Sequence, residues 1–477
     1  MNTTAALQAE SRTADVPAPM EAPEVSLGRA ILLAAVAAGA FHLAYAFPPL
    51  SFLIVVYLYG LVQLSSLPTG RRAFYFGLAV GYAVYAPHLT FFWTIFGWPA
   101  IALWTVLAFW LGLFVALARQ CRSKFGRLSV LLIPFLWTGL EYFRGELYYL
   151  RFSWLSVGYA FSESPQLLTA TRLGMYEIGL ASMALAVLLS LLSKGRALVL
   201  PAACLAALAC FLNLPIRSAI SRKLPAVRVA GVQLEFPAPF EVTAALDKLL
   251  DRYPETDLFV LSEYTFDGPI PDRVKSWCRQ HQKYLVVGGK DSVSSDEFYN
   301  TAFVIGPDGE IVFKQVKSVP IQFFKDGLPA REQKLWESPW GKLGICVCYD
   351  LSYRQVTDEL VRQGAGAILA PTMDVADWGG YQHRLHGRVA PIRAAEYGVP
   401  IFRVCSSGIS QLIDHTGRFK ASAPFPGQGE IIAGELELSA RGHVPFDRWL
   451  APLSVLVTAV TIFWLALKRI LERFSRV

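Results

Sequence analysis

The stretch Leu343–Gln363, with the sequence LGICVCYDLSYRQVTDELVRQ, decides the fold of the second half of the chain. Its first five residues form a short apolar run that favours a strand, and Cys348 closes this run. From about Ser352 to Gln363, apolar and polar residues recur with the period of an amphipathic helix. The stretch therefore predicts a cysteine placed between the end of a strand and the start of a helix.

Two other polar residues stand at the ends of apolar runs. Glu263 follows Leu258–Leu261, and Lys317 follows Glu310–Phe313. A thiol attacks a carbonyl only as the thiolate, which a helix N-terminus and a nearby lysine favour. Glu263 would act as the general base, and Lys317 could bind the oxyanion. Taken alone, each is ordinary: a core cysteine, a surface carboxylate and a surface amine. Their joint occurrence at strand ends predicts a catalytic Glu263, Lys317 and Cys348 set.

Two neighbouring residues compete for these roles. Cys346 is a second thiol, and we interpret it as core packing inside the strand. Lys314 competes with Lys317, which we favour because it lies just past the strand. Cys346 and Cys348 make a weak metal site, since no second cysteine pair or suitable histidine cluster accompanies them. The odd count of 7 cysteines shows no framework spacing, so no structural disulfide is expected.

The region 225–445 alternates short β-rich runs with amphipathic helices, which predicts an α/β sandwich. Strands are expected at 227–234, 258–262, 284–289, 300–306, 310–316, 343–348, 366–370 and 400–405. Helices are expected near 241–252, 271–282, 352–363 and 384–397.

The composition of the whole chain indicates a membrane protein. Of its 477 residues, 54% are hydrophobic and 17% are charged, whereas soluble proteins carry about 25% charged residues. The mean hydropathy is +0.39. The net charge of +7 comes from basic residues beside apolar segments, where such residues set membrane topology. Nucleic-acid binding is therefore not expected.

Eight apolar segments predict about eight transmembrane helices. They lie at about 29–47, 50–67, 73–90, 99–118, 128–143, 176–193, 197–214 and 449–467. Residues 1–26 are rich in Ala, Pro, Glu, Ser and Thr and should form a disordered tail. The predicted order is thus the tail, helices one to seven in 27–224, the α/β domain in 225–445, and helix eight with a cytoplasmic tail in 446–477.

The loops between these segments alternate in charge. Every second loop is basic, and the basic residues are Arg71, Arg72, Arg119, Arg122, Lys124, Arg127, Lys194, Arg196, Lys468, Arg469, Arg473 and Arg476. This alternation places both termini in the cytoplasm and 225–445 outside. The long loop with Arg144, Arg151 and Arg172 departs mildly from the pattern, and we interpret it as structured and functional.

Several short runs resemble a known superfamily. Leu261-Ser262-Glu263-Tyr264, Tyr299-Asn300-Thr301 and Cys348-Tyr349-Asp350 resemble the Pro-Glu strand end, the Tyr-Asn-Ser/Thr run and the Cys-Tyr-Glu motif of the carbon–nitrogen hydrolase (nitrilase) superfamily. Leu136–Gly145 and Ser153–Tyr159 resemble two membrane-domain motifs of the apolipoprotein N-acyltransferase family within it, which ordinary nitrilases lack.

This resemblance implies a helical membrane bundle joined to a nitrilase-type αββα sandwich. It also implies a two-step acyl transfer that needs no metal or organic cofactor. Cys348 would take an acyl chain from a membrane phospholipid, and the α-amine of a diacylglyceryl-cysteine at an apolipoprotein N-terminus would attack the thioester. Glu263 would move the protons and Lys317 would stabilise each oxyanion. The enzyme would lie in the bacterial inner membrane, with the catalytic domain on the periplasmic face.

The sequence departs from the family around the predicted site. The residues after Lys317, from Ser318 to Phe324, lack the family's His and the Glu of its Phe-Gly-Glu. Met373–Trp378 replaces the family's Asn-Asp-Ala-Trp. These departures keep two alternatives open: a membrane-anchored nitrilase-family amidase that hydrolyses a C–N bond, and a non-enzymatic transporter or scaffold. The presence of all three predicted catalytic residues disfavours the second.

Overall fold

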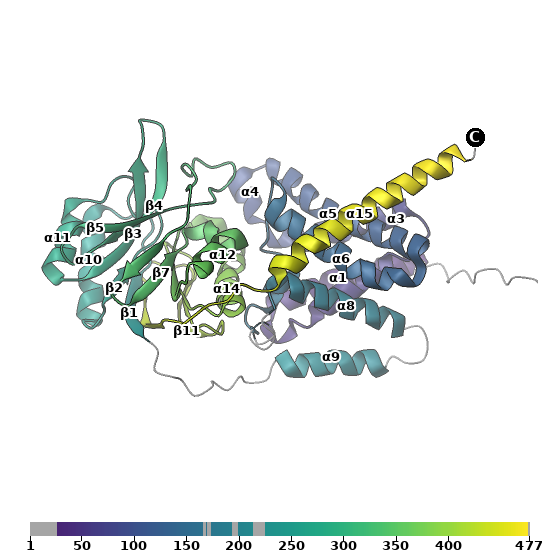
Figure 1. The fold of residues 1–477 in the computed structure, drawn as a ribbon, viewed down its shortest axis with the longest axis horizontal. Coiled ribbons are helices and arrows are strands. Elements are labelled where there is room, and N and C mark those ends of the chain that lie inside the picture. The colour runs from purple at the N-terminus through teal and green to yellow at the C-terminus, as the bar shows by residue number, and fades with distance from the viewer. Residues whose placement is uncertain (1–25, 166–167, 169–172, 193–198, 213–224, 476–477) are drawn as a thin grey trace, which may run out of the picture.

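The structure of the protein is a computed structural model that describes residues 26–165, 168, 173–192, 199–212 and 225–475. Its elements separate into two halves, a bundle of apolar helices and an α/β domain (Figure 1). The predicted disordered tail lies outside the described residues except for Ser26, and so does Arg172.

All eight apolar segments of the sequence contain a helix. These helices are α1 (Leu27–Ala46), α2 (Leu53–Leu64), α3 (Gly70–His88), α5 (Pro99–Phe125), α6 (Ser129–Tyr142), α8 (Met175–Leu192), α9 (Val199–Leu212) and α15 (Asp447–Phe474). Small residues let some of them approach closely: a Cβ added to Gly81 of α3 would lie 2.6 Å from the Cα of Ala108 of α5. The C-terminal helix α15 packs against α6 and α8, so it belongs to the same bundle (Figure 1).

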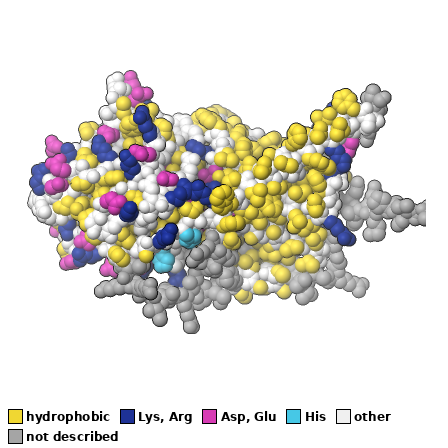
Figure 2. All heavy atoms as spheres, in the orientation of Figure 1, with side chains coloured by type: hydrophobic (Ala, Val, Ile, Leu, Met, Phe, Trp, Pro, Cys, Tyr) yellow, Lys and Arg dark blue, Asp and Glu magenta, His cyan; other side chains and the backbone are white. Residues whose placement is uncertain are grey.

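Four stretches of the described residues are long and apolar enough to cross a membrane. They are Leu27–Ala46, Pro99–Leu147, Met175–Leu192 and Asp447–Phe474. With 12 and 14 residues, α2 and α9 are shorter than a spanning helix, which needs about 20. The structure thus gives four candidate spanning stretches where the sequence predicted eight spans. Figure 2 shows hydrophobic side chains covering the helical half and charged side chains gathered on the α/β half.

Two six-stranded sheets face each other in the α/β domain. Their strand orders are β12-β1-β2-β3-β4-β5 and β11-β10-β9-β8-β7-β6. The first comprises β1 (Ala226–Val232), β2 (Leu258–Val260), β3 (Tyr284–Ser292), β4 (Phe298–Ile305), β5 (Ile311–Val316) and β12 (Ile431–Glu437). The second comprises β6 (Leu335–Ser338), β7 (Gly341–Ile345), β8 (Ala367–Thr372), β9 (Ile401–Cys405), β10 (Ser410–Ile413) and β11 (Phe419–Ala423).

Helices cover the outer face of each sheet. The first sheet carries α10 (Pro239–Arg252) and α11 (Asp272–His281), and the second carries α12 (Arg354–Arg362) and α14 (Val389–Tyr397) (Figure 1). The predicted αββα sandwich is therefore confirmed. Strands β1 to β3 and β7 to β9 run parallel within their sheets. Parallel strands bring their carboxyl ends to one edge, where residues that follow β2, β7 and β8 can meet.

Two sequence predictions needed correction in detail. The helix expected at 384–397 is two helices, α13 (Gly379–Gly387) and α14, which meet at Arg388. The helix expected from Ser352 begins at Arg354, because a 3-10 turn, η5 (Cys348–Ser352), comes first. The sequence analysis did not predict β6, β10, β11 and β12.

The described part of the loop between α6 and α8 is structured, as predicted, and it joins the two halves. It contains η3 (Phe143–Leu147) and η4 (Val157–Phe161). From the α/β domain, the buried guanidinium of Arg388 donates to the carbonyls of Tyr159 at 3.2 Å and Tyr45 at 2.6 Å. Glu396 accepts from the backbone N–H of Met175 at 3.0 Å. These buried polar contacts fix the orientation of the α/β domain on the bundle.

Candidate active site

Cys348 occupies a sharp turn directly after β7. Its φ is +52°, a left-handed conformation that costs a non-glycine residue free energy. Asp350 holds this turn, because its buried carboxylate accepts from the backbone N–H groups of Ser318, Val319 and Val347 at 3.0, 2.7 and 3.3 Å. Burial raises the pKa of Asp350 to about 7, although the Lys317 charge and these hydrogen bonds lower it. Asp350 thereby ties the cysteine turn to the segment after Lys317.

Glu263 lies just past the end of β2 and is buried. Its Oε1 accepts from the Nζ of Lys317 at 2.8 Å and from the Nδ2 of Asn300 at 2.6 Å. Its Oε2 accepts from the backbone N–H of Met373, which follows β8, at 3.0 Å. Gly288 allows this arrangement, since a Cβ there would lie 2.5 Å from the Cα of Glu263. The carboxylate is therefore held at both oxygens.

Lys317 follows β5 and is completely buried. Its Nζ contacts Glu263 and also the Oδ2 of Asp326 at 2.7 Å. Burial opposes its charge, but the two carboxylates outweigh burial and hold the pKa of Lys317 well above its usual value. Lys314, the competing lysine, is half-exposed and pairs with Asp291 at 2.7 Å. The structure brings Lys317, and not Lys314, to Glu263.

Cys348 is 3% exposed, and its thiol lies 3.7 Å from the carbonyl oxygen of Met373. Burial raises the pKa of this thiol, and the charge of Glu263 raises it further, while Lys317 lowers it. Lys317 thus favours the thiolate, as expected, but burial and Glu263 oppose it more strongly. The thiol is protonated at rest, and Glu263 is the neighbouring carboxylate that can take its proton.

The sequence analysis did not single out Asp326 or the role of Asn300. Asn300 holds Glu263 and Asp326 together, donating to the Oδ1 of Asp326 at 3.0 Å. Asp326 also accepts from the hydroxyl of Tyr264 at 2.8 Å. The Phe-Phe-Lys-Asp-Gly run at 323–327 carries an acidic residue near the expected Phe-Gly-Glu, and this signal could have identified Asp326.

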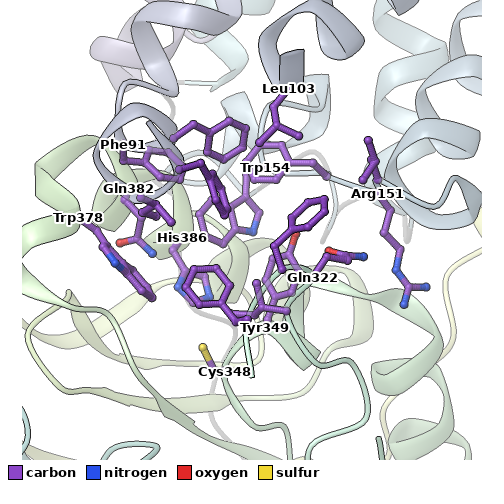
Figure 3. A pocket seen from close by; sticks show the side chains of 18 of the residues that line it. Phe91, Leu103, Arg151, Trp154, Gln322, Cys348, Tyr349, Trp378, Gln382 and His386 are labelled. Carbon is purple, nitrogen blue, oxygen red and sulfur yellow. The ribbon is translucent and has the colours of Figure 1, made fainter. Parts of the chain in front are cut away.

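Two cavities meet at the candidate catalytic residues. The first has a volume of about 110 Å³ and is mostly apolar, and Cys348 lies at its floor (Figure 3). Its far wall comes from α4 (Phe91–Phe96) and α5 of the bundle. The second has a volume of about 540 Å³, and its lining mixes apolar side chains with charged ones, among them Glu263, Lys317 and Asp326. Ile321, Phe324, Met373 and Trp378 border both cavities. The thiol thus faces an apolar space, and the carboxylate and the ammonium face a space whose lining carries charged groups.

Comparisons with known proteins match both halves of the chain. Residues 218–445 match the carbon–nitrogen hydrolase family, and residues 33–188 match the apolipoprotein N-acyltransferase N-terminal domain. An apolipoprotein N-acyltransferase of Geobacter metallireducens is 25% identical over 80% of this chain and 84% of its own length. One of Shewanella oneidensis is 26% identical over 68% of this chain and 73% of its own.

A formamidase of Bacillus cereus is 27% identical over 28% of this chain and 51% of its own length. Percentage identity therefore does not separate transferases from hydrolases here. The match of the membrane half to the apolipoprotein N-acyltransferase N-terminal domain does separate them. The two family models match both halves of this chain, and the acyltransferase relatives align along most of it, so we conclude that it belongs to the apolipoprotein N-acyltransferase family of the carbon–nitrogen hydrolase superfamily.

Proposed function

We propose that this protein transfers an acyl chain from a membrane phospholipid, through a thioester on Cys348, to the α-amine of the N-terminal diacylglyceryl-cysteine of apolipoproteins. The position of Cys348 carries the proposal. Its thiol faces an apolar cavity walled by bundle helices, while Glu263 and Lys317 face a second cavity with several charged residues in its lining. An acyl chain fits the first environment, and a phospholipid headgroup fits the charged lining of the second.

In the first half-reaction, the carboxylate of Glu263 takes the thiol proton as the sulfur attacks the ester carbonyl. The tetrahedral oxyanion forms beside the ammonium of Lys317, whose charge is secured by Glu263 and Asp326. The intermediate then breaks its C–O bond, and Glu263 returns the proton to the departing alkoxide. The products are the Cys348 thioester and a lysophospholipid.

In the second half-reaction, the α-amine of the acceptor attacks the thioester carbonyl. The new oxyanion again forms beside Lys317, and the C–S bond breaks. Glu263 moves a proton from the amine nitrogen to the departing thiolate, which restores the resting thiol. The buried position of Cys348 keeps water from the thioester until the amine arrives.

We propose that the enzyme lies in the bacterial inner membrane with all eight apolar helices crossing it. The alternating basic loops support cytoplasmic termini and a periplasmic α/β domain. Single cysteines placed at the exposed residue Asp308 and at the half-buried residue Arg122 should report this orientation in intact cells. A membrane-impermeant maleimide should label position 308 and leave position 122 unlabelled. Labelling at both positions, or at neither, would contradict the proposed topology.

A phospholipid labelled in one acyl chain tests the function. The purified protein should move the label to a diacylglyceryl-cysteinyl peptide with a free amine and release one lysophospholipid per product. The same peptide with an acetylated amine is the matched control and should receive no label. Label recovered only as free fatty acid with either peptide would make the protein a lipid-directed hydrolase. Cleavage of a small amide, with phospholipid left intact, would establish the amidase alternative.

A further inference from the structure

His386 is a buried residue of the active site that the reaction described above does not use. It lies on α13 and lines the apolar cavity together with Cys348 (Figure 3). Its Nδ1 lies 2.7 Å from the Oδ1 of Asp374, and the Oδ2 of Asp374 accepts from Arg403 at 2.6 Å. Asp374 is completely buried and also accepts from the Nε2 of Gln382 at 2.8 Å. A carboxylate, an imidazole and a thiol thus border one cavity.

The tautomer of His386 follows from this geometry. Although burial opposes its charge, His386 and Arg403 hold the pKa of Asp374 below its usual range, so its carboxylate can only accept hydrogen bonds. Nδ1 therefore carries the proton, and Nε2 of the neutral ring is a free acceptor. Within the described residues, Nε2 has no hydrogen-bond partner.

The ring of His386 is held in one plane. It stacks on Trp154 with a centroid distance of 4.6 Å and an interplanar angle of 16°. The indole N–H of Trp154 donates to the Oγ of Ser352 at 2.9 Å, close to the cysteine turn. The imidazole is therefore oriented on one side by Asp374 and on its face by a residue of the membrane half.

We propose that His386 is the general base that deprotonates the acceptor amine in the second half-reaction. This inference rests on the proposed function. The acceptor arrives as an ammonium ion, since α-amino groups have pKa values of about 7.7–8.0. Nε2 takes one proton, which leaves a neutral amine that attacks the thioester. Glu263 passes the second proton from nitrogen to the sulfur of Cys348. The imidazolium, paired with Asp374, then releases its proton to solvent.

The environment of Glu263 explains why a second base is needed. Both of its oxygens are engaged, Oε1 by Lys317 and Asn300 and Oε2 by Met373. It can exchange one proton with the thiol, but the amine must lose two. His386 is suited to take the other proton of the ammonium group. Burial lowers the pKa of His386, and Arg403 and His383 lower it further, while Asp374 raises it. The ring is thus neutral at pH 7.

The test compares two half-reactions and two nucleophiles at pH 7. In His386→Gln, lysophospholipid release on thioester formation should change by less than threefold. The rate of thioester discharge to the diacylglyceryl-peptide should fall about 100-fold, which is the lower end of the typical contribution of a general base. Discharge to hydroxylamine, which is uncharged at pH 7, should be nearly unaffected. The peptide deficit should shrink as the pH rises to 9, where the amine is deprotonated in solution.

His383→Gln is the matched control. His383 lies on the same helix and is equally buried, but it stacks on Phe425 and does not line the cavity. This variant should discharge the thioester to both nucleophiles at the wild-type rate. Equal losses with peptide and hydroxylamine in His386→Gln would show a merely structural role, and wild-type discharge to the peptide would also overturn the proposal. If the wild-type protein itself forms no thioester, the proposed function fails instead.

Discussion

Cys348→Ser should give a folded protein that forms no acyl-enzyme and loses roughly 10⁴-fold or more in transfer activity, as expected when a catalytic nucleophile is removed. A serine hydroxyl is far less acidic than a thiol, and Glu263 cannot activate it to the same degree. The change adds no bulk, so the strained turn at φ +52° and its hydrogen bonds to Asp350 should persist. The rate of lysophospholipid release measures the loss of acyl transfer, and the thermal unfolding midpoint shows whether the protein remains folded.

Cys346→Ser is the control for this substitution. Cys346 directly follows β7 and is completely buried in the hydrophobic core. It lies two residues before Cys348 and lines neither cavity at the active site. Burying a hydroxyl without a partner should cost about 1–3 kcal/mol in stability, while most of the activity remains. An inactive Cys346→Ser beside an active Cys348→Ser would show that the nucleophile has been assigned to the wrong thiol.

Lys317→Ala should damage both stability and catalysis. It leaves the carboxylates of Glu263 and Asp326 buried together without their shared cation, which should cost about 3–5 kcal/mol in the free energy of unfolding. Loss of an oxyanion donor typically lowers the rate about 10²- to 10³-fold. Denaturant titration measures the first effect and single-turnover thioester formation the second.

The pH dependence of this deficit follows from the pKa of Lys317. Because the folded-state pKa lies above the unfolded value of about 10.4, the stabilisation is fully present below that value and is lost only as the pH rises through the folded pKa. The wild-type contribution should therefore be constant between pH 6 and 9. Lys314→Ala, at a half-exposed pair, should cost less than about 1 kcal/mol. Equal losses in the two variants would contradict the assignment of the lysine.

The sequence was most informative about the site where a polar residue follows the end of a predicted strand. The ends of apolar runs located Glu263, Lys317 and Cys348, because a strand end fixes where the next side chain stands. The structure then brought the first two within 2.8 Å of each other. The spacing between lysines was also sufficient to favour Lys317 over Lys314, since only Lys317 lies past β5.

Features that depend on long-range folding could not be read in the same way. Asp326 and His386 reach the site from a loop and a helix that carry no strand-end pattern. The pKa of Cys348 is set by burial and by Glu263, and neither effect follows from a helix dipole considered alone. Hydropathy located the eight apolar helices but not their lengths, because an apolar run of near-spanning length can fold into a helix as short as the 12 residues of α2.

The mass of the intact protein tests the central claim most directly. Incubated with phospholipid and no acceptor, the wild-type protein should gain the mass of one acyl chain, and peptide mapping should place it on Cys348. Addition of a diacylglyceryl-cysteinyl peptide with a free amine should return the protein to its original mass and yield the N-acylated peptide. A protein that gains no acyl mass from phospholipid, or gains it at a residue other than Cys348, would contradict this account.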